Sequence, residues 1–209
     1  MAINLQKGQT INLDKETNDL SSITIGLGWK VKQKPGFFAR LLGGGDEYDL
    51  DASALVLDVN GKIQSLGNQQ LVGSDIIFFN NLQHHTGTIM HTGDNLVGGA
   101  GVQDDEQIIV RLTSIPPQYH RLLFIVTIYE GNKKRQHFGM VERAFMRAVD
   151  AKGVEICRYN LAEDSAYSNM ATMVFGEVYR KDAGWKFRAI GDAYPYDSFL
   201  PLLQQHLPN

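Results

Sequence analysis

The sequence has few features of secreted or membrane proteins. Cys157 is its only cysteine, so no disulfide can form within the chain and a reducing compartment is expected. No apolar run approaches the roughly 18 residues that a membrane-spanning helix needs, and the first residues, MAINLQKGQTINLDKE, contain no signal-peptide pattern. We therefore expect a soluble, cytoplasmic protein.

Positive charge is not in excess either. The 209 residues include 20 Lys and Arg against 23 Asp and Glu, for a net charge of −3. A general nucleic-acid binder normally needs a basic face, so no nucleic-acid partner is expected. Hydrophobic residues make up 43% of the chain, which is ordinary for a globular protein, and no break in composition divides it. We expect a single domain over residues 1–209.

Short apolar segments separated by turn residues predict an all-β fold. Residues 23–29 alternate between large apolar residues and Thr or Gly, and residues 122–129, LLFIVTIY, are typical of a central strand. Further strands are expected at 51–57, 75–79, 107–112, 155–159, 171–180 and 185–191, with a helical turn at 139–142 before a strand that ends at 150. Only residues 199–207 have clear helical spacing. The pattern favours a β-sandwich of two sheets with short helices, including a C-terminal helix.

One insertion interrupts this pattern. Residues 30–46, KVKQKPGFFARLLGGGD, contain four basic residues, the pair Phe37-Phe38 and three consecutive glycines. We interpret the insertion as an extended hairpin or mobile loop with a solvated tip. The alternative is a membrane contact, in which the basic residues meet anionic lipid headgroups and the two aromatic rings insert.

The most informative feature is an acidic loop. Between Gly93 and Glu106 the chain reads GDNLVGGAGVQDDE, with four carboxylates and no Lys or Arg. Such a concentration of negative charge is unfavourable unless a cation neutralises it. The loop offers hard oxygen ligands and neither sulfur nor imidazole, which is the donor chemistry that Ca²⁺ prefers.

Two other segments offer oxygen donors. Asp49 and Asp51 begin a predicted strand and share one face of it, and Asn80 follows the predicted strand at 75–79. Loops from distant parts of the sequence meet at the two ends of a β-sandwich. The sequence therefore predicts a site for one or two calcium ions shared between loops. The competing interpretation is a solvated acidic loop with salt bridges to nearby bases.

Other chemistries are less well supported. An EF-hand that began at Asp49 would need Gly and Glu where Ala54 and Asn60 stand, and the acids near Gly99 and Gly101 would repel phosphate. The histidines His84, His85 and His91 match no standard zinc spacing, so we interpret them as polar loop residues, one of which orders the acidic loop. No serine lies in a nucleophile elbow. An enzyme is not expected, and a metal-dependent hydrolase is the less favoured alternative.

The order of motifs along nearly the whole chain resembles the TerD family of bacterial tellurium-resistance and stress-response proteins. The most specific part is HTGDNLVG (91–98) followed by DDE (104–106). The other motifs are GLGW (26–29), DLDAS (49–53), FFNN (78–81), FGMVERAFMRAVD (138–150), EICRYNL (155–161) and GEVYRKDAGWKFRAIG (176–191).

This resemblance implies a cytoplasmic, calcium-binding β-sandwich without established catalytic activity. It also implies work in membrane-associated or metal-sensing stress complexes, with other products of the same operon or the inner membrane surface as partners. The implied calcium ligands are Asp49, Asp51, Asn80, Asp94, Asn95, Asp104, Asp105 and Glu106. One departure concerns the loop, where GGAGVQ stands in place of the family's usual Gly-x-Gly-x-Gly run before DDE. A calcium-dependent membrane adaptor that uses residues 30–46 is the alternative function.

Overall fold

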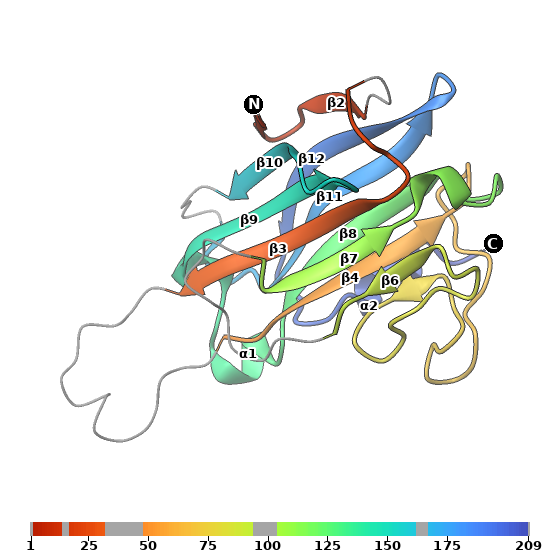
Figure 1. Ribbon diagram of the computed structural model, residues 1–209. Helices are drawn as coiled ribbons and strands as arrows, with labels where there is room; N and C mark the ends of the chain where they lie inside the picture. Colours follow the sequence, from red (N-terminus) through yellow and green to blue (C-terminus); the bar gives the residue numbers. More distant parts are fainter. Residues whose placement is uncertain (1, 14–16, 32–47, 94–103, 162–166, 209) are drawn as a thin grey trace.

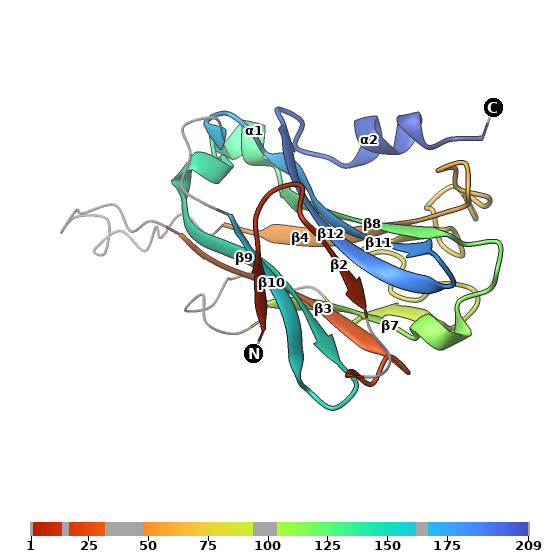
Figure 2. The same cartoon turned by 90° about the horizontal axis from the view of Figure 1, so that it is seen from above.

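A computed structural model describes residues 2–13, 17–31, 48–93, 104–161 and 167–208 (Figure 1). These residues form two six-stranded sheets that pack face to face (Figure 2). The expected β-sandwich of two sheets is therefore confirmed.

Sheet A has the strand order β1-β10-β9-β3-β7-β6. Its strands are β1 (Ile3–Leu5), β3 (Ile23–Val31), β6 (Ile89–His91), β7 (Glu106–Val110), β9 (Val141–Asp150) and β10 (Glu155–Leu161). All of its neighbours are antiparallel except β1, which pairs with β10 in parallel. The alternating segment at residues 23–29 became the long strand β3 near the centre of this sheet.

Sheet B has the order β2-β12-β11-β8-β4-β5. Its strands are β2 (Thr10–Leu13), β4 (Leu50–Leu57), β5 (Ile76–Ile77), β8 (Arg121–Ile128), β11 (Thr172–Lys181) and β12 (Gly184–Tyr194). The apolar run at residues 122–129 lies in β8, between β11 and β4, as its composition predicts.

The central strands of sheet B, β4, β8 and most of β11, are buried on both faces, which explains why they are almost continuously apolar. The inner face of sheet B packs on sheet A, where Trp29 and Phe124 belong to the main core. Its outer face carries a second cluster in which Leu55 and Leu123 pack with Leu203 of the C-terminal helix. Figure 2 shows this helix, α2 (Leu200–Gln205), above the outer face of sheet B.

The remaining helical elements are short. They are α1 (Gly131–Lys134) and the 3-10 turns η1 (Leu112–Ser114) and η2 (Phe138–Met140). The expected helical turn at 139–142 corresponds to η2, and β9 follows it at once. Within the described ranges, neither α-helix has the length and apolar character needed to cross a membrane.

Two expectations differ from the structure in extent. The strand expected at 75–79 is only two residues long, because the chain turns back at Phe78–Asn81 and the Asn81 amide donates to the Ile76 carbonyl at 2.6 Å. β3 continues to Val31, and the rest of the 30–46 insertion, up to residue 46, lies outside the described residues.

The interior of the sandwich should be sensitive to truncation. Phe175 is fully buried and its ring contacts Tyr159 edge-on, whereas Phe79 is 51% exposed. We expect Phe175→Ala to lower the free energy of unfolding by about 3–5 kcal/mol, because it leaves a cavity in a packed core. Phe79→Ala is the matched control and should change it by less than about 0.5 kcal/mol. Urea unfolding measures both, and equal losses would contradict the packing described here.

Candidate functional site

The acidic segment Asp104–Glu106 lies where β7 begins, at the end of the sandwich where β3 finishes and β4 starts (Figure 1). Leu27 of β3 is the register partner of Glu106. The three acids therefore lie next to residues 26–29 of β3. Each of them has a different environment.

Asp104 is held by an arginine from another strand. Arg147 of β9 donates to both carboxylate oxygens of Asp104, from Nε at 2.7 Å and from Nη2 at 3.1 Å. Gln107 adds a third donor at 3.0 Å, and the Asp104 side chain is only 2% exposed. The hydrogen bond to Asp104 is the main reason that the pKa of Arg147 is raised. The charge of Asp104 is thus neutralised from within the protein.

Gly26 makes room for this ion pair. A Cβ atom at Gly26 would overlap the carboxylate of Asp104, so a side chain there would displace it. Arg147 is also the register partner of Gly26 across β3 and β9. The first glycine of the GLGW segment therefore has a role in sheet A that involves the acidic segment directly.

Asp105 immediately precedes β7 and extends its hydrogen bonding with β3 by one residue. Its backbone N–H donates to Leu27 at 2.7 Å, and its carboxylate accepts the N–H of Trp29 at 2.9 Å. The indole N–H of Trp29 in turn donates to the Tyr48 carbonyl at 3.3 Å. Trp29 therefore connects Asp105 to the segment that leads into β4.

Glu106 joins the two sheets. It belongs to sheet A, is 2% exposed, and accepts the N–H of Ala52 in sheet B at 2.7 Å. The N–H groups of alternate β4 residues point toward β5, as Val56 shows by donating to Asp75, but β5 pairs only with Ala54 and Leu55. The Glu106 carboxylate thus satisfies a backbone N–H that lies past the end of β5.

His91 lies against the same carboxylate. Its Nε2 atom is 3.5 Å from Glu106, and its Nδ1 accepts the N–H of Gly93 at 3.0 Å. The imidazole is 3% exposed. It therefore contacts both Gly93 and Glu106, the first and last residues of the acidic loop. Residues 94–103 lie outside the described residues, so the role of a histidine in ordering this loop stays a prediction.

The structure brings the start of β4, where Asp49 and Asp51 lie, to this site. Asp49 lies just before β4, and its carbonyl accepts the N–H of Tyr129 at 2.9 Å. Asp51 pairs with Thr127 on the outer face of sheet B, because its neighbours Leu50 and Ala52 point into the core. Residues 48–52, which include the start of β4 and the two residues before it, are therefore the segment that contacts Trp29 and Glu106.

The other expected ligands are placed differently. Asn80 is exposed on the turn after β5, and its amide donates to the Gln70 carbonyl at 3.2 Å. Asp94 and Asn95 lie outside the described residues.

The donor set at this end of the sandwich consists of oxygen atoms on hard, anionic groups. Asp105 accepts the N–H of Trp29 and Glu106 accepts that of Ala52, and each of these hydrogen bonds uses one of the about four lone-pair sites of an ionised carboxylate. Asp104 differs, because a guanidinium already binds both of its oxygens. The sequence analysis did not identify Arg147 as a residue of the site. Its place in the motif FGMVERAFMRAVD was the only feature of the sequence that could have indicated it.

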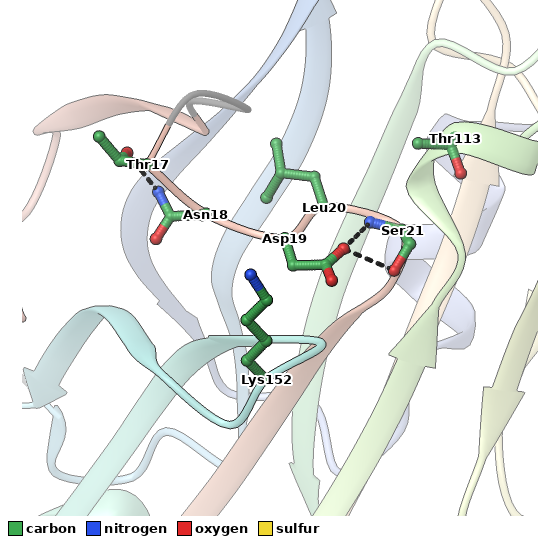
Figure 3. Close-up of a pocket in the computed structure, with 7 residues that line it drawn as sticks. All are labelled: Thr17, Asn18, Asp19, Leu20, Ser21, Thr113 and Lys152. Atoms are coloured by element: carbon green, nitrogen blue, oxygen red, sulfur yellow. Dashed lines mark hydrogen bonds between the residues drawn. The ribbon is translucent and has the colours of Figure 1, made fainter.

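A separate pocket of about 430 Å³ lies elsewhere. Thr17, Asp19, Ser21, Thr113 and Lys152 are among the residues that line it (Figure 3). Hydrogen bonds from Ser21 lower the pKa of Asp19 and hold its carboxylate in a local turn. The pocket adjoins the start of β3, at the opposite end of this strand from Trp29 and the acids. It is not part of the acidic site.

The family model of the TerD domain matches residues 1–206. The chain belongs to the TerD domain family. It is 48% identical to tellurium resistance protein TerX of Serratia marcescens over 214 residues, which cover 99% of this chain and 100% of TerX. It is 43% identical to stress response protein SCP2 of Bacillus subtilis over 92% of each chain. It is 38% identical to tellurium resistance protein TerD of Serratia marcescens over 93% of this chain and 92% of that relative.

A solved structure supports the fold of this TerD domain. A homologue of telluride resistance protein TerD from Streptomyces coelicolor superposes with a TM-score of 0.62 at 16% identity. The match covers 90% of this chain and 99% of that one. At this level of identity the likeness concerns the fold alone.

The Arg147–Asp104 pair should contribute measurably to the stability of the TerD domain. Arg147→Met removes the guanidinium and leaves the buried carboxylate of Asp104 with the Gln107 amide as its donor, so we expect a loss of about 2–3 kcal/mol in the free energy of unfolding. The control is Arg143→Met on the same strand, where the side chain is 63% exposed and the loss should stay below about 0.5 kcal/mol. Urea unfolding at neutral pH distinguishes the two, and equal unfolding midpoints would show that Asp104 does not depend on this pair.

Proposed function

We propose that this TerD-domain protein is a calcium-binding, non-enzymatic stress-response protein associated with tellurite resistance. The observation that supports it most directly is the contact between Glu106 of sheet A and Ala52 of sheet B, at 2.7 Å, beside Asp105. It brings the acids after residue 103 to the segment that contains Asp49 and Asp51. The names of the relatives, tellurium resistance and stress response proteins, supply the physiological context.

The donor chemistry favours Ca²⁺ over softer metals. Carboxylate and carbonyl oxygens from separate segments suit an ion that accepts roughly six to eight oxygens in adaptable geometry. On this proposal Asp105, Glu106 and Asp49 form the centre of the site, and Asp51, Asn80, Asp94 and Asn95 are further candidate ligands. Asp104 would lie next to the ion-binding residues without being a central ligand, because Arg147 already neutralises its charge.

The bound ion would supply positive charge that holds the ends of β3, β4 and β7 together. Hydrogen bonds from Trp29 and Ala52 already orient the Asp105 and Glu106 carboxylates, so little ordering of these two side chains would be needed on binding. Binding would therefore act mainly on the stability of this end of the sandwich. Stress-response proteins of the same operon or the inner membrane surface are the partners that we propose, in the cytoplasm.

Calcium should raise the thermal stability of the protein. At about a thousand times its dissociation constant, Ca²⁺ is expected to add about 4 kcal/mol. For a chain of this size that corresponds to a rise of roughly 8–16 °C in Tm. Differential scanning calorimetry in EDTA and in millimolar Ca²⁺ measures the difference, and coincident melts would refute a calcium site.

A charge-neutral substitution locates the ion. Asp105→Asn keeps an acceptor for the Trp29 N–H and should abolish most of the calcium-dependent rise in Tm. The matched control is Asp58→Asn, which changes an aspartate that also accepts backbone N–H groups, from Asn60 and Lys62. Its calcium-dependent rise should equal that of the unmodified protein. If both variants keep the full rise, the ion binds elsewhere.

A further inference from the structure

A second group of metal-ligating side chains lies away from the acidic segment. Ligand atoms of Asp75, His84 and His85 all lie within 4.8 Å of one another, and within the described residues this is the one such group of at least three His, Cys, Asp or Glu. Asp75 immediately precedes β5, and its carbonyl accepts the N–H of Val56 near the C-terminal end of β4. Asp49 and Asp51 are at the other end of that strand.

We propose that Asp75, His84 and His85 form a site for a borderline divalent metal, and that Zn²⁺ is the ion it takes. Imidazole nitrogen and carboxylate oxygen are a ligand combination that zinc accepts. The fourth position would hold water, because the His85 side chain is 42% exposed and opens the group to solvent. This site is independent of the calcium proposal and shares no residue with it.

The distances fit ligands that share one ion. The Asp75 Oδ1 atom is 3.0 Å from Nε2 of His84 and 3.9 Å from Nδ1 of His85. Tetrahedral zinc with bonds of about 2.1 Å holds its ligand atoms about 3.4 Å apart, between these two values. The longer separation exceeds a hydrogen bond. The His85 ring is held in this orientation by the contact of its Nε2 atom with the Tyr119 hydroxyl at 3.4 Å and by its packing on the His84 ring, with centroids 4.2 Å apart.

The carboxylate is already oriented for a metal. Oδ2 of Asp75 accepts the backbone N–H groups of Gln64 at 2.6 Å and Ser65 at 2.9 Å, which turns Oδ1 toward the histidines. Burial alone would raise the pKa of Asp75, but hydrogen bonds from His84, Tyr119 and these two N–H groups lower it below its usual value. Tyr119 donates to Oδ1 at 2.8 Å, and burial followed by Asp75 raises the pKa of its hydroxyl. The geometry thus holds Oδ1 of Asp75 facing both imidazoles.

His84 has a partner for its other nitrogen. Nδ1 lies 2.7 Å from the hydroxyl of Thr86, which lies 2.7 Å from the hydroxyl of Thr88. A hydroxyl both donates and accepts, so this chain can reverse its direction. The backbone N–H of Thr86 also lies 3.4 Å from Nδ1, a long contact that is lost when the imidazole proton is on Nδ1. With a metal on Nε2 and the proton on Nδ1, Nδ1 donates to the Thr86 hydroxyl and Thr86 donates to Thr88. Metal-bound histidines commonly have such a partner.

Calorimetric titration tests the site on the full chain. The protein is treated with EDTA, desalted and titrated with ZnCl₂ in millimolar Ca²⁺, which occupies sites selective for hard ions. We expect one equivalent of Zn²⁺ to bind. His85→Ala should weaken this binding at least about tenfold, because it removes a ligand from the surface. His120→Ala removes an imidazole from outside the group and should leave the affinity unchanged.

A substitution that keeps all three ligands but removes the partner of His84 distinguishes metal binding from a hydrogen-bond network with a purely structural role. Thr86→Val removes the hydroxyl at similar volume and should weaken zinc binding roughly tenfold, since it takes away the partner of the His84 Nδ1 proton. Thermal melts without zinc confirm that each variant is folded. Absence of zinc binding in the unmodified protein would overturn the proposal. Equal affinities of the His85→Ala and His120→Ala variants would also overturn it, as would loss of zinc binding on Asp105→Asn alone.

Discussion

A carboxylate removed from water needs donors or a cation, and this requirement organises much of the sandwich. Glu106 takes the N–H of Ala52, Asp104 takes the guanidinium of Arg147, and Asp75 takes donors from four residues. Glu177 follows the same rule on the outer face of sheet B, where Arg188 lies at 2.8 Å and Arg121 at 3.3 Å. Each of these acids connects segments that are far apart in the sequence. Electrostatic compensation therefore determines which strand ends are held together.

The alternation of apolar residues was sufficient to predict most strands of both sheets. It worked where one or both faces of a strand are buried, as in β3, β8 and β11. It failed for β1 and β2, which are largely exposed, and for β6, which is only three residues long, because such segments have little alternation to detect. β5 was predicted too long, because the local pattern does not reveal that a side-chain amide of Asn81 takes a carbonyl of the strand.

The candidate site was predictable only in part. The density of acids between residues 93 and 106 is a local property and was evident. Arg147, which is 43 positions from Asp104, is joined to it by strand order that no local pattern specifies. The group of Asp75, His84 and His85 is similar: the two histidines are adjacent in the sequence, but the carboxylate that completes the group precedes a different turn. Which of these side chains come together depends on strand pairing and on the path of residues 58–74, which connect β4 to the segment before β5.

The first strands also have a consequence for biosynthesis. β1 pairs with Cys157–Tyr159 and β2 with residues 185–188, so these two strands meet their neighbours in the sheets only after β10 and β12 have been translated. During that interval the margins of both layers are open to other nascent chains. β1 and β2 can therefore complete one edge of each sheet only after β10 and β12 have left the ribosome.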